Sequence, residues 1–343
     1  YQLVQLYAGR YIKGGPNTQL GIPIKLNTTD LNLPRSTVQK VYEQINTDID
    51  VAITGLTGYA RTNKSHFNAN VAMGLKARVA LTQGEWDIAA TMAVKARAGF
   101  SLMSQATYKD GFRIDSQGNS EFMWASQIIA DQTDKWGNFG AYMSRNFSSS
   151  AIRGNPRSIN SKLYGLISAT DVRKTLWDPT GQHLNLPAGI SLLGSHARKP
   201  YTSQKFIAVS NGDSRVDVPH MRAAEMYLIE AEALARKGGQ DVNAAQALFA
   251  LVSSRDSGYT LSTNRNQALI DEIMIHRRVE LWGEGFRFYD LKRLNAPLDR
   301  TGANHIAALA NNNLSIPASD IRWEWLIPQD EIDANPNMVQ NDI

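Results

Sequence analysis

The sequence contains no cysteine among its 343 residues. Disulfide bonds, thiolate catalysis and cysteine-ligated zinc are therefore excluded within this chain. No apolar run reaches the roughly 18 residues that a membrane-spanning helix needs, so no transmembrane helix is predicted. The net charge is only +4, and Lys and Arg are scattered without a basic run. That distribution does not indicate a nucleic-acid-binding protein.

Catalytic and cofactor-binding motifs are also missing. There is no G-x-S-x-G elbow, no H-E-x-x-H pair, no P-loop and no dinucleotide-binding fingerprint. The Gly-Glu-Gly at 283–285 lacks a third glycine and follows a predicted helix. No histidine lies at metal-ligand spacing from another. We therefore predict a protein that is not an enzyme and has no cofactor, no catalytic residue and no metal ligand.

The stretch Ile270–Leu294, IDEIMIHRRVELWGEGFRFYDLKRL, is the most strongly patterned part of the chain. Its apolar residues recur at helical spacing, Gly283 and Gly285 interrupt the pattern, and an apolar surface then resumes. Opposite charges recur three residues apart, as on one side of a helix. The expected pairs are Glu284–Arg287, Arg287–Asp290 and Asp290–Arg293. Because these charges alternate with aromatic residues, we predict a partly buried ion-pair network that holds two helices together.

Carboxylates in this stretch have a second interpretation. Glu280 and Glu284 could in principle act as a general acid and base. Each has an arginine nearby in the sequence, which would keep the carboxylate ionised and occupied. The structural interpretation is therefore favoured.

Two segments have the pattern of tetratricopeptide helix–turn–helix repeats. Residues 67–99 contain a face of small residues and then LTQGEWDIAATMA, with its glycine turn, aromatic residue and alanine spacing. The same pattern returns at Ala231–Phe249, preceded by a helical stripe that begins at Met221. Repeats of this kind bury their faces only by stacking on one another. The fold must therefore bring the two units together.

The other segments are less regular. Tyr1–Tyr11 has the apolar pattern of a helix without an N-terminal cap, and 14–34 is predicted to be a long connection. Ser36 is expected to cap a helix that ends near Gly55, with Gln39 completing a capping box. Residues 101–217, called the excursion here, are rich in Ser, Gly, Asn and aromatics. Strands are expected there at 121–129 and 205–209, and a helical period at 159–176. The tail, 295–343, is predicted to be irregular apart from one turn at 330–332.

The best candidate for a binding site lies in the excursion. WGNFGAY, at 136–142, places three aromatic residues and an asparagine among glycines. Exposed aromatic rings can stack on the C–H faces of sugars, while Asn, Asp and Arg bind the hydroxyl groups. The alternative is that one or two of the rings anchor the loop in the core. The predicted ligand-binding residues are Trp136, Asn138, Phe139, Tyr142, Asp134, Arg145 and Trp177, with Asp131 and Lys135 as further polar partners. Trp177 is included because Asp178-Pro179 after it predicts an exposed turn.

Three segments resemble one known family. HRRVELWGEGFRFYDLKRL is similar to the signature near the C-terminus of SusD/RagB proteins. PHMRAAEMYLIEAEALAR, following Lys205–Phe206, and the ending WLIPQDEIDANPNMVQN resemble the same family in the same order. This resemblance implies a mainly α, tetratricopeptide-like scaffold with a loop-rich excursion and a few short strands. Residues 1–343 would form a single domain whose N-terminal part is missing, with repeat helices at about 1–100 and 218–294.

The same resemblance implies a function. SusD-like proteins capture oligosaccharide at the outer face of the outer membrane, without chemistry, for a SusC-like TonB-dependent transporter. Membrane contact would be only through a lipid anchor that lies outside this chain. The alternatives are peptide-nutrient capture by a RagB-like protein, a tetratricopeptide adaptor that binds a protein partner, and a glycoside hydrolase with two carboxylates flanking a cleft.

Overall fold

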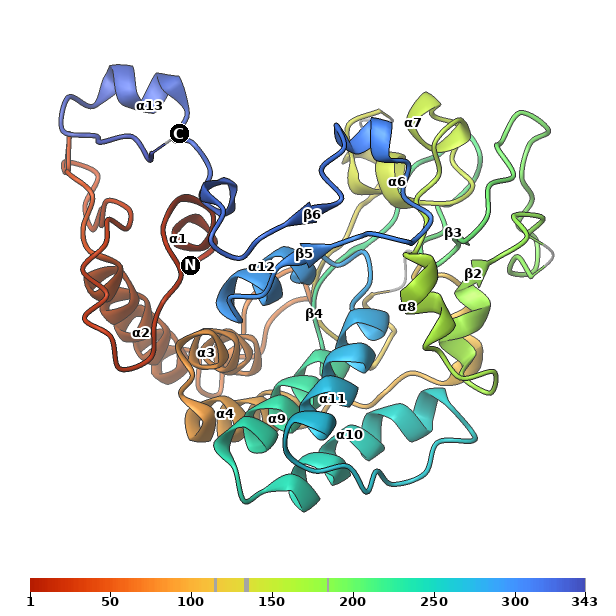
Figure 1. Cartoon of the computed structure of the whole chain (residues 1–343), viewed down its shortest axis with the longest axis horizontal. Helices are drawn as coiled ribbons and strands as arrows, with labels where there is room; N and C mark the ends of the chain where they lie inside the picture. Colours follow the sequence, from red (N-terminus) through yellow and green to blue (C-terminus); the bar gives the residue numbers. More distant parts are fainter. Residues whose placement is uncertain (114–115, 133–135, 184, 343) are drawn as a thin grey trace.

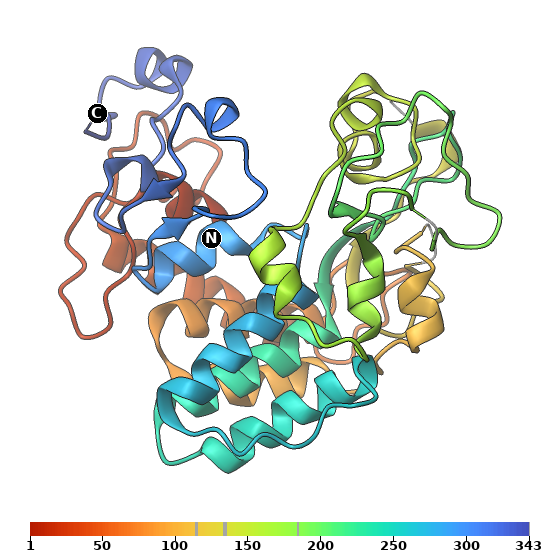
Figure 2. The same ribbon diagram turned by 45° about the vertical axis from the view of Figure 1, so that its right-hand side comes forward.

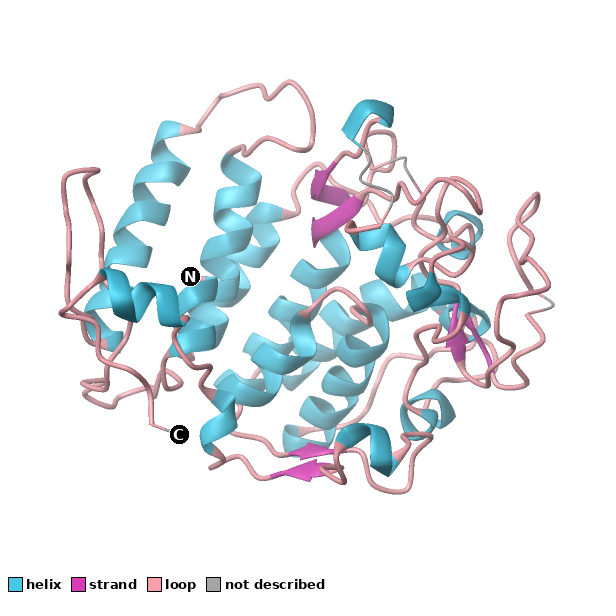
Figure 3. Ribbon diagram, turned by 90° about the horizontal axis from the view of Figure 1, so that it is seen from above, coloured by secondary structure: helices cyan, strands magenta, loops and turns pink. Residues whose placement is uncertain are grey.

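The computed structural model describes residues 1–113, 116–132, 136–183 and 185–342, and these are mostly helical with short strands (Figure 3). This confirms the predicted fold class. The two predicted repeats are α3 (Ala69–Gln83) with α4 (Trp86–Ala96), and α9 (Ala223–Lys237) with α10 (Asp241–Arg255). Helix α4 packs against α9, so the repeats lie side by side, as expected (Figure 1).

Small side chains explain this close packing. One core cluster is shared by α3, α4 and α9 and is built largely from alanines, among them Ala77, Ala89, Ala93 and Ala233. Asn68 caps α3 by accepting from the Val71 amide, and Gly84 ends it in the left-handed region (φ 76°). Helix α11 (Asn266–Glu280) packs on the other side of α9 and α10. Met221, expected in the helical stripe, lies instead in a strand that precedes α9.

The first helices differ slightly from the prediction. Helix α2 (Val38–Gly55) ends where expected, but Thr37, not Ser36, is its N-cap, because the Thr37 hydroxyl accepts from the Lys40 amide. Helix α1 (Gln2–Tyr7) occupies only the first part of the predicted segment, and its C-cap Ala8 is extended. The connection between the two helices contains no regular element beyond a single β-bridge between Leu20 and Thr37.

The excursion is built from short elements. Its helices and the strands that pair with it are α5 (Gln105–Lys109), β1 (Phe122–Ser126), η1 (Ala130–Gln132), α6 (Phe139–Met143), α7 (Ser150–Arg153), α8 (Ser161–Gly165), η2 (Val172–Leu176), β2 (Trp177–Asp178), β3 (Thr202–Ser203) and β4 (Val218–Arg222). The strand predicted at 121–129 is confirmed as β1, which pairs antiparallel with β4. The helix expected at 159–176 is divided into α8 and η2.

The strand predicted at 205–209 is wrong. Phe206, Ile207 and Ala208 are buried, which produced the strand-like pattern, but they do not join a ladder. Their backbone groups pair with separate segments instead. The Phe206 carbonyl accepts from Arg145, and the Ile207 amide donates to Gly111.

The tail is held on the N-terminal helix. It contains β5 (Leu298–Asp299), η3 (Ala307–Ala310), β6 (Ser315–Ile316), η4 (Ile321–Trp323) and α13 (Gln329–Ala334), the last confirming the predicted turn. The Trp325 amide donates to the Leu6 carbonyl, and its ring packs on Tyr7. Figure 2 shows the first residues and the tail on one side, the excursion on the other and the repeat helices below both. No helix in the described part of the chain is long and apolar enough to cross a membrane.

Candidate functional site

Helix α6 carries the predicted aromatic segment and is fixed at its N-terminus. The side-chain Oδ1 of Asn138 accepts from the Ala141 amide at 2.9 Å, and its side-chain Nδ2 donates to the Ser214 hydroxyl at 2.8 Å. A Cβ atom on Gly140 would lie 1.9 Å from the Ser214 carbonyl oxygen. Only glycine allows this contact. Asn138, expected to bind ligand, is therefore engaged as the cap that seats α6 on residue 214.

Two of the predicted rings lie on the surface, Trp136 just before this helix and Tyr142 within it. Trp136 is 63% exposed and Tyr142 is 46% exposed. The Trp136 ring packs on the buried Phe147, with centroids 5.7 Å apart. Exposed rings on a fixed backbone provide the apolar component of a ligand site at little conformational cost.

Arg157 is a polar neighbour of this surface that sequence reasoning missed. Its exposed side chain donates from Nε to the Tyr142 carbonyl at 3.1 Å. Fifteen residues separate the two in the chain, so no local motif signals the contact. Trp136, Tyr142 and Arg157 together are called the α6 surface below.

Phe139 points the other way. Its ring meets the buried Phe206 edge-to-face, with centroids 5.0 Å apart and the planes at 85°. It thus follows the alternative considered from the sequence, in which one ring of the segment anchors the loop.

Arg145 also lies inside the excursion, only 1% exposed. It donates from Nε to His183 Nε2 at 3.3 Å and from Nη2 to the Ala197 carbonyl at 2.7 Å. Burial and the neighbouring Arg198 lower the pKa of Arg145 to about 10. The structure therefore does not place this guanidinium on the surface with Trp136. Asp134 and Lys135, also predicted to contribute, lie outside the described residues, and Asp131 is exposed in η1.

The expected exposure of Trp177 is wrong. The ring is 2% exposed and packs on Trp282, with centroids 5.7 Å apart. The sequence Asp178-Pro179 predicted a turn, but Trp177 and Asp178 form β2, which pairs with β3. The pairing places the indole in the main core cluster of the excursion.

The predicted ion-pair network exists, but most of its partners come from elsewhere in the sequence. Asp290–Arg293 forms at 2.8 Å, and Asp290 also pairs with Arg277. The expected Glu284–Arg287 and Arg287–Asp290 pairs do not form, because Glu284 pairs with Lys205 and Arg222 and Asp290 is already paired, which leaves Arg287 exposed. The buried pairs around the signature are Arg222–Glu121, Arg222–Glu280, Arg222–Glu284, Arg255–Glu121, Arg255–Glu280, Arg173–Glu280, Arg173–Asp171 and Lys205–Glu284.

This pairing determines what Glu280 and Glu284 can do. Burial opposes their ionisation, but the surrounding cations outweigh it. Arg255, Arg222 and Arg173 hold the pKa of Glu280 well below its usual range, and Arg222 with Lys205 lowers that of Glu284. Carboxylates held ionised and occupied in this way do not act as general acids. In the described part of the chain, no group of three or more acidic or histidine side chains could hold a metal ion.

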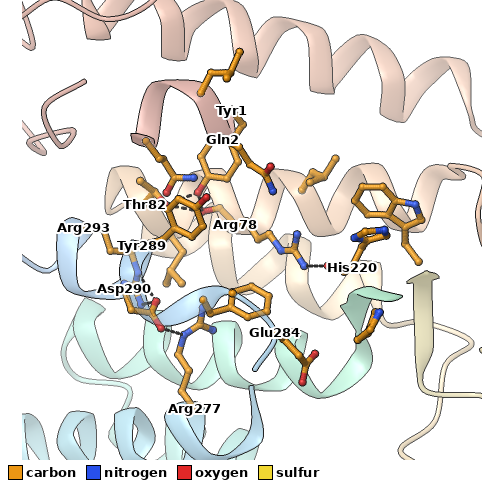
Figure 4. Close-up of a pocket in the computed structure, with 18 residues that line it drawn as sticks. Tyr1, Gln2, Arg78, Thr82, His220, Arg277, Glu284, Tyr289, Asp290 and Arg293 are labelled. Atoms are coloured by element: carbon orange, nitrogen blue, oxygen red, sulfur yellow. Dashed lines mark hydrogen bonds and ion pairs between the residues drawn. The ribbon is translucent and has the colours of Figure 1, made fainter. Parts of the chain in front are cut away.

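A cavity of about 580 Å³ lies between α1, α3, β4 and the signature helices (Figure 4). Its volume is in the range of ligand sites. Its charged groups are largely paired already, Arg277 with Asp290, which also lines the cavity, and Arg78 with Glu225, which lies behind the lining. The Phe286 ring has the guanidinium of Arg78 at 5.1 Å and that of Arg277 at 5.3 Å. Few of these groups remain to bind a sugar, so the α6 surface is the stronger candidate.

Two family models match the chain. The model described as "SusD family" matches residues 174–343, and the model described as "Starch-binding associating with outer membrane" matches residues 1–81. This chain belongs to the SusD/RagB family. The α6 surface lies in residues 82–173, between the two SusD matches.

Solved SusD-like structures share the whole fold. A SusD superfamily protein from Bacteroides thetaiotaomicron is 26% identical, with a TM-score of 0.77, and the match covers 99% of this chain and 74% of that one. A SusD-like carbohydrate-binding protein from Bacteroides vulgatus is 24% identical, with a TM-score of 0.80 over 98% and 73% of the two chains. A laminarin-binding SusD-like protein is 22% identical, with a TM-score of 0.68 over 93% and 73%. A search of curated proteins found no match.

Proposed function

We propose that this protein captures an oligosaccharide without chemically changing it, and that the α6 surface forms the site. The observation that carries the proposal is the pair of exposed rings at a fixed short helix, Trp136 two residues before its N-cap and Tyr142 within it. Their faces would stack on the apolar faces of sugar rings. Arg157, beside Tyr142, would donate to hydroxyl groups.

Relatives support a glycan as the ligand. One matching family model is described as starch-binding, one similar structure as a carbohydrate-binding protein and another as laminarin-binding. A capture protein must release what it binds, so we expect a dissociation constant between about 1 mM and 1 µM, or roughly −4 to −8 kcal/mol.

Delivery to a transporter is the second part of the proposal. Membership of the SusD/RagB family supports a SusC-like TonB-dependent transporter as the partner that receives the glycan. The description of the second family model, "associating with outer membrane", supports a location at that membrane. A lipid anchor facing the outside belongs to the same proposal.

Binding without catalysis is supported by the state of the acidic residues. Glu121, Glu280 and Glu284 are buried and each accepts from at least one cation. None of them flanks the α6 surface with a free carboxylate.

A glycan-panel screen by affinity electrophoresis tests the proposal. Gels containing starch, laminarin and other soluble polysaccharides would be run with the wild type, Trp136→Ala and Tyr59→Ala. Tyr59 is 49% exposed and lies after α2, so it controls for loss of an exposed ring elsewhere. We expect one polysaccharide to retard the wild type and Tyr59→Ala but not Trp136→Ala. No retardation of folded wild type by any glycan would overturn glycan capture and favour peptide capture.

A further inference from the structure

The sequence offers no local reason why α6 should be held in one position, because it is five residues long and flanked by loops. The structure shows that its inner side rests on Phe206, the excursion residue next to the buried Lys205. These two residues in turn meet the turn between α11 and α12 (Phe286–Arg293), which belongs to the family signature.

Lys205 makes the first contact. Its side chain is fully buried, and its ammonium group donates to the Glu280 carbonyl at 2.8 Å, the Trp282 carbonyl at 2.8 Å and Glu284 Oε1 at 2.6 Å. An ammonium group has three N–H donors, and all three are therefore used on this turn. Moving Lys205 would leave a buried charge without partners, which is strongly unfavourable.

Phe206 makes the second contact. A Cβ atom on Gly283 would lie 2.8 Å from Phe206 Cε2 and 3.1 Å from Met143 Cε, so the signature turn touches both the Phe206 ring and the last residue of α6. The Phe206 ring also packs on Phe139, the first residue of α6. The Phe206 carbonyl accepts from the Arg145 amide at 2.9 Å, just beyond the helix. Phe206 thus contacts both ends of the element that presents Trp136 and Tyr142.

We infer that Lys205 and Phe206 are positioning residues, which transmit the position of the signature turn to α6 and hold Trp136 and Tyr142 ready for the ligand. This inference rests on the proposed glycan-binding function of the α6 surface. Rings that are already in place lose less conformational entropy when the ligand binds. The signature therefore contributes to affinity from inside the protein, without touching the sugar.

Lys292 provides a matched control. It is also buried, and it donates to two backbone carbonyls, those of Gln5 and Trp323, each at 2.7 Å. Burial lowers the pKa of both lysines to about 8. Lys292, however, holds α12 to the N-terminal helix and the tail, and has no contact with the excursion among the described residues. A general loss of stability would affect both lysine variants alike.

The experiment compares Lys205→Met with Lys292→Met by two measurements. Hydrogen–deuterium exchange of the 138–145 amides reports on α6 without any ligand. Titration with the polysaccharide retained in the electrophoresis screen reports on affinity. We expect Lys205→Met to speed exchange at 138–145 at least tenfold and to weaken affinity at least fivefold. We expect Lys292→Met to keep α6 protected and its affinity within twofold of wild type.

Three results would overturn the inference. The first is a folded Lys205→Met protein whose 138–145 amides exchange as slowly as in the wild type. The second is a Lys205→Met protein that binds the polysaccharide as tightly as the wild type. The third is an equal change in exchange and affinity in the two lysine variants. If Lys205→Met does not fold, Phe206→Leu tests the inference instead. This variant removes the ring contact with Phe139 and leaves the Lys205 ammonium group in place. Wild-type α6 exchange or affinity in Phe206→Leu would then reject the positioning role. Failure of the wild type to bind any glycan would reject the proposed function, while the exchange measurement would still test the link to α6.

Discussion

Arg255 Nη2 in α10 lies 2.6 Å from Oε2 of Glu121, the residue just before β1, although 134 residues separate the two in the chain. Both side chains are fully buried. The pair joins a repeat helix to the excursion, and Glu121 also pairs with Arg222. The scaffold and the candidate binding region thus share one buried network of charges.

Removing one charge from this network should strongly destabilise the folded protein. Glu280 accepts from Arg173, Arg222 and Arg255, so Glu280→Gln removes one ionic partner from each of them. Four buried cations (Arg173, Arg222, Arg255 and Lys205) then share the three carboxylates of Asp171, Glu121 and Glu284. We expect a loss of about 3–5 kcal/mol in the free energy of unfolding, measured by urea denaturation. Asp87→Asn, which breaks the exposed pair with Lys237, should change it by less than about 0.5 kcal/mol. Equal losses in the two variants would contradict the buried network.

Replacing the two glycines of the signature turn by alanine should cost different amounts of stability. Both have positive φ, 78° at Gly283 and 87° at Gly285, so an alanine at either position costs roughly 1–2 kcal/mol in strain. A Cβ atom at Gly285 would meet nothing within 4 Å, whereas one at Gly283 would press on Phe206 and Met143. Thermal unfolding should therefore show a larger loss of stability for Gly283→Ala than for Gly285→Ala. Equal losses would mean that the contact with Phe206 is unimportant.

Acid should destabilise the excursion through His183. Burial and the Arg145 guanidinium lower the pKa of His183 to about 4, below the value of about 6.5 expected in the unfolded chain. Between these two pH values the unfolded state binds a proton that the folded state does not, so stability falls as the pH drops from 6.5 to 4. The contribution of His183 is on the order of 1–3 kcal/mol.

Comparison with His183→Gln isolates that contribution from those of other groups. The variant has no imidazole to protonate, so the stability gap between wild type and variant should shrink as the pH drops from 7.5 to 4.5. Urea denaturation at several pH values measures the gap. A gap that stays constant across this range would show that His183 does not titrate differently on folding.

Trp136 and Trp177, both predicted from the sequence to bind ligand, should differ in how much they contribute to stability. Trp177 is buried in the excursion core, so Trp177→Ala should cost about 3–5 kcal/mol. Trp136 is mostly exposed, so Trp136→Ala should cost no more than about 1 kcal/mol. Chemical denaturation of both variants checks this order. A larger loss for Trp136→Ala would mean that its ring anchors the loop and does not form a binding platform.

The helical scaffold was predictable because its signals are local. Residues three and four apart set the faces of α2, α3, α9 and α11, and the glycine turn between α3 and α4 has a periodic pattern. The local composition of the excursion also predicted that Trp136 and Tyr142 lie in a loop-rich segment, and both are exposed.

The orientation of individual excursion residues was not predictable in this way. Phe139, Arg145 and Trp177 face inward because of contacts with Phe206, Ala197 and Trp282, which lie 52 to 105 residues away in the chain and so beyond the reach of any local period. The partners of Glu280 and Glu284 are equally distant. Spacing along one helix predicted Arg287 as a partner, but burial selected Arg222 and Lys205, which come from the β4 strand and the excursion.

The most direct test of glycan capture at the α6 surface is calorimetric titration of the polysaccharide retained in the electrophoresis screen into wild type, Trp136→Ala and Tyr59→Ala. We expect Trp136→Ala to weaken binding at least tenfold, equivalent to about 1.4 kcal/mol, and Tyr59→Ala to stay within twofold of wild type. Wild-type affinity in a folded Trp136→Ala protein would contradict the account and place the sugar elsewhere on the molecule.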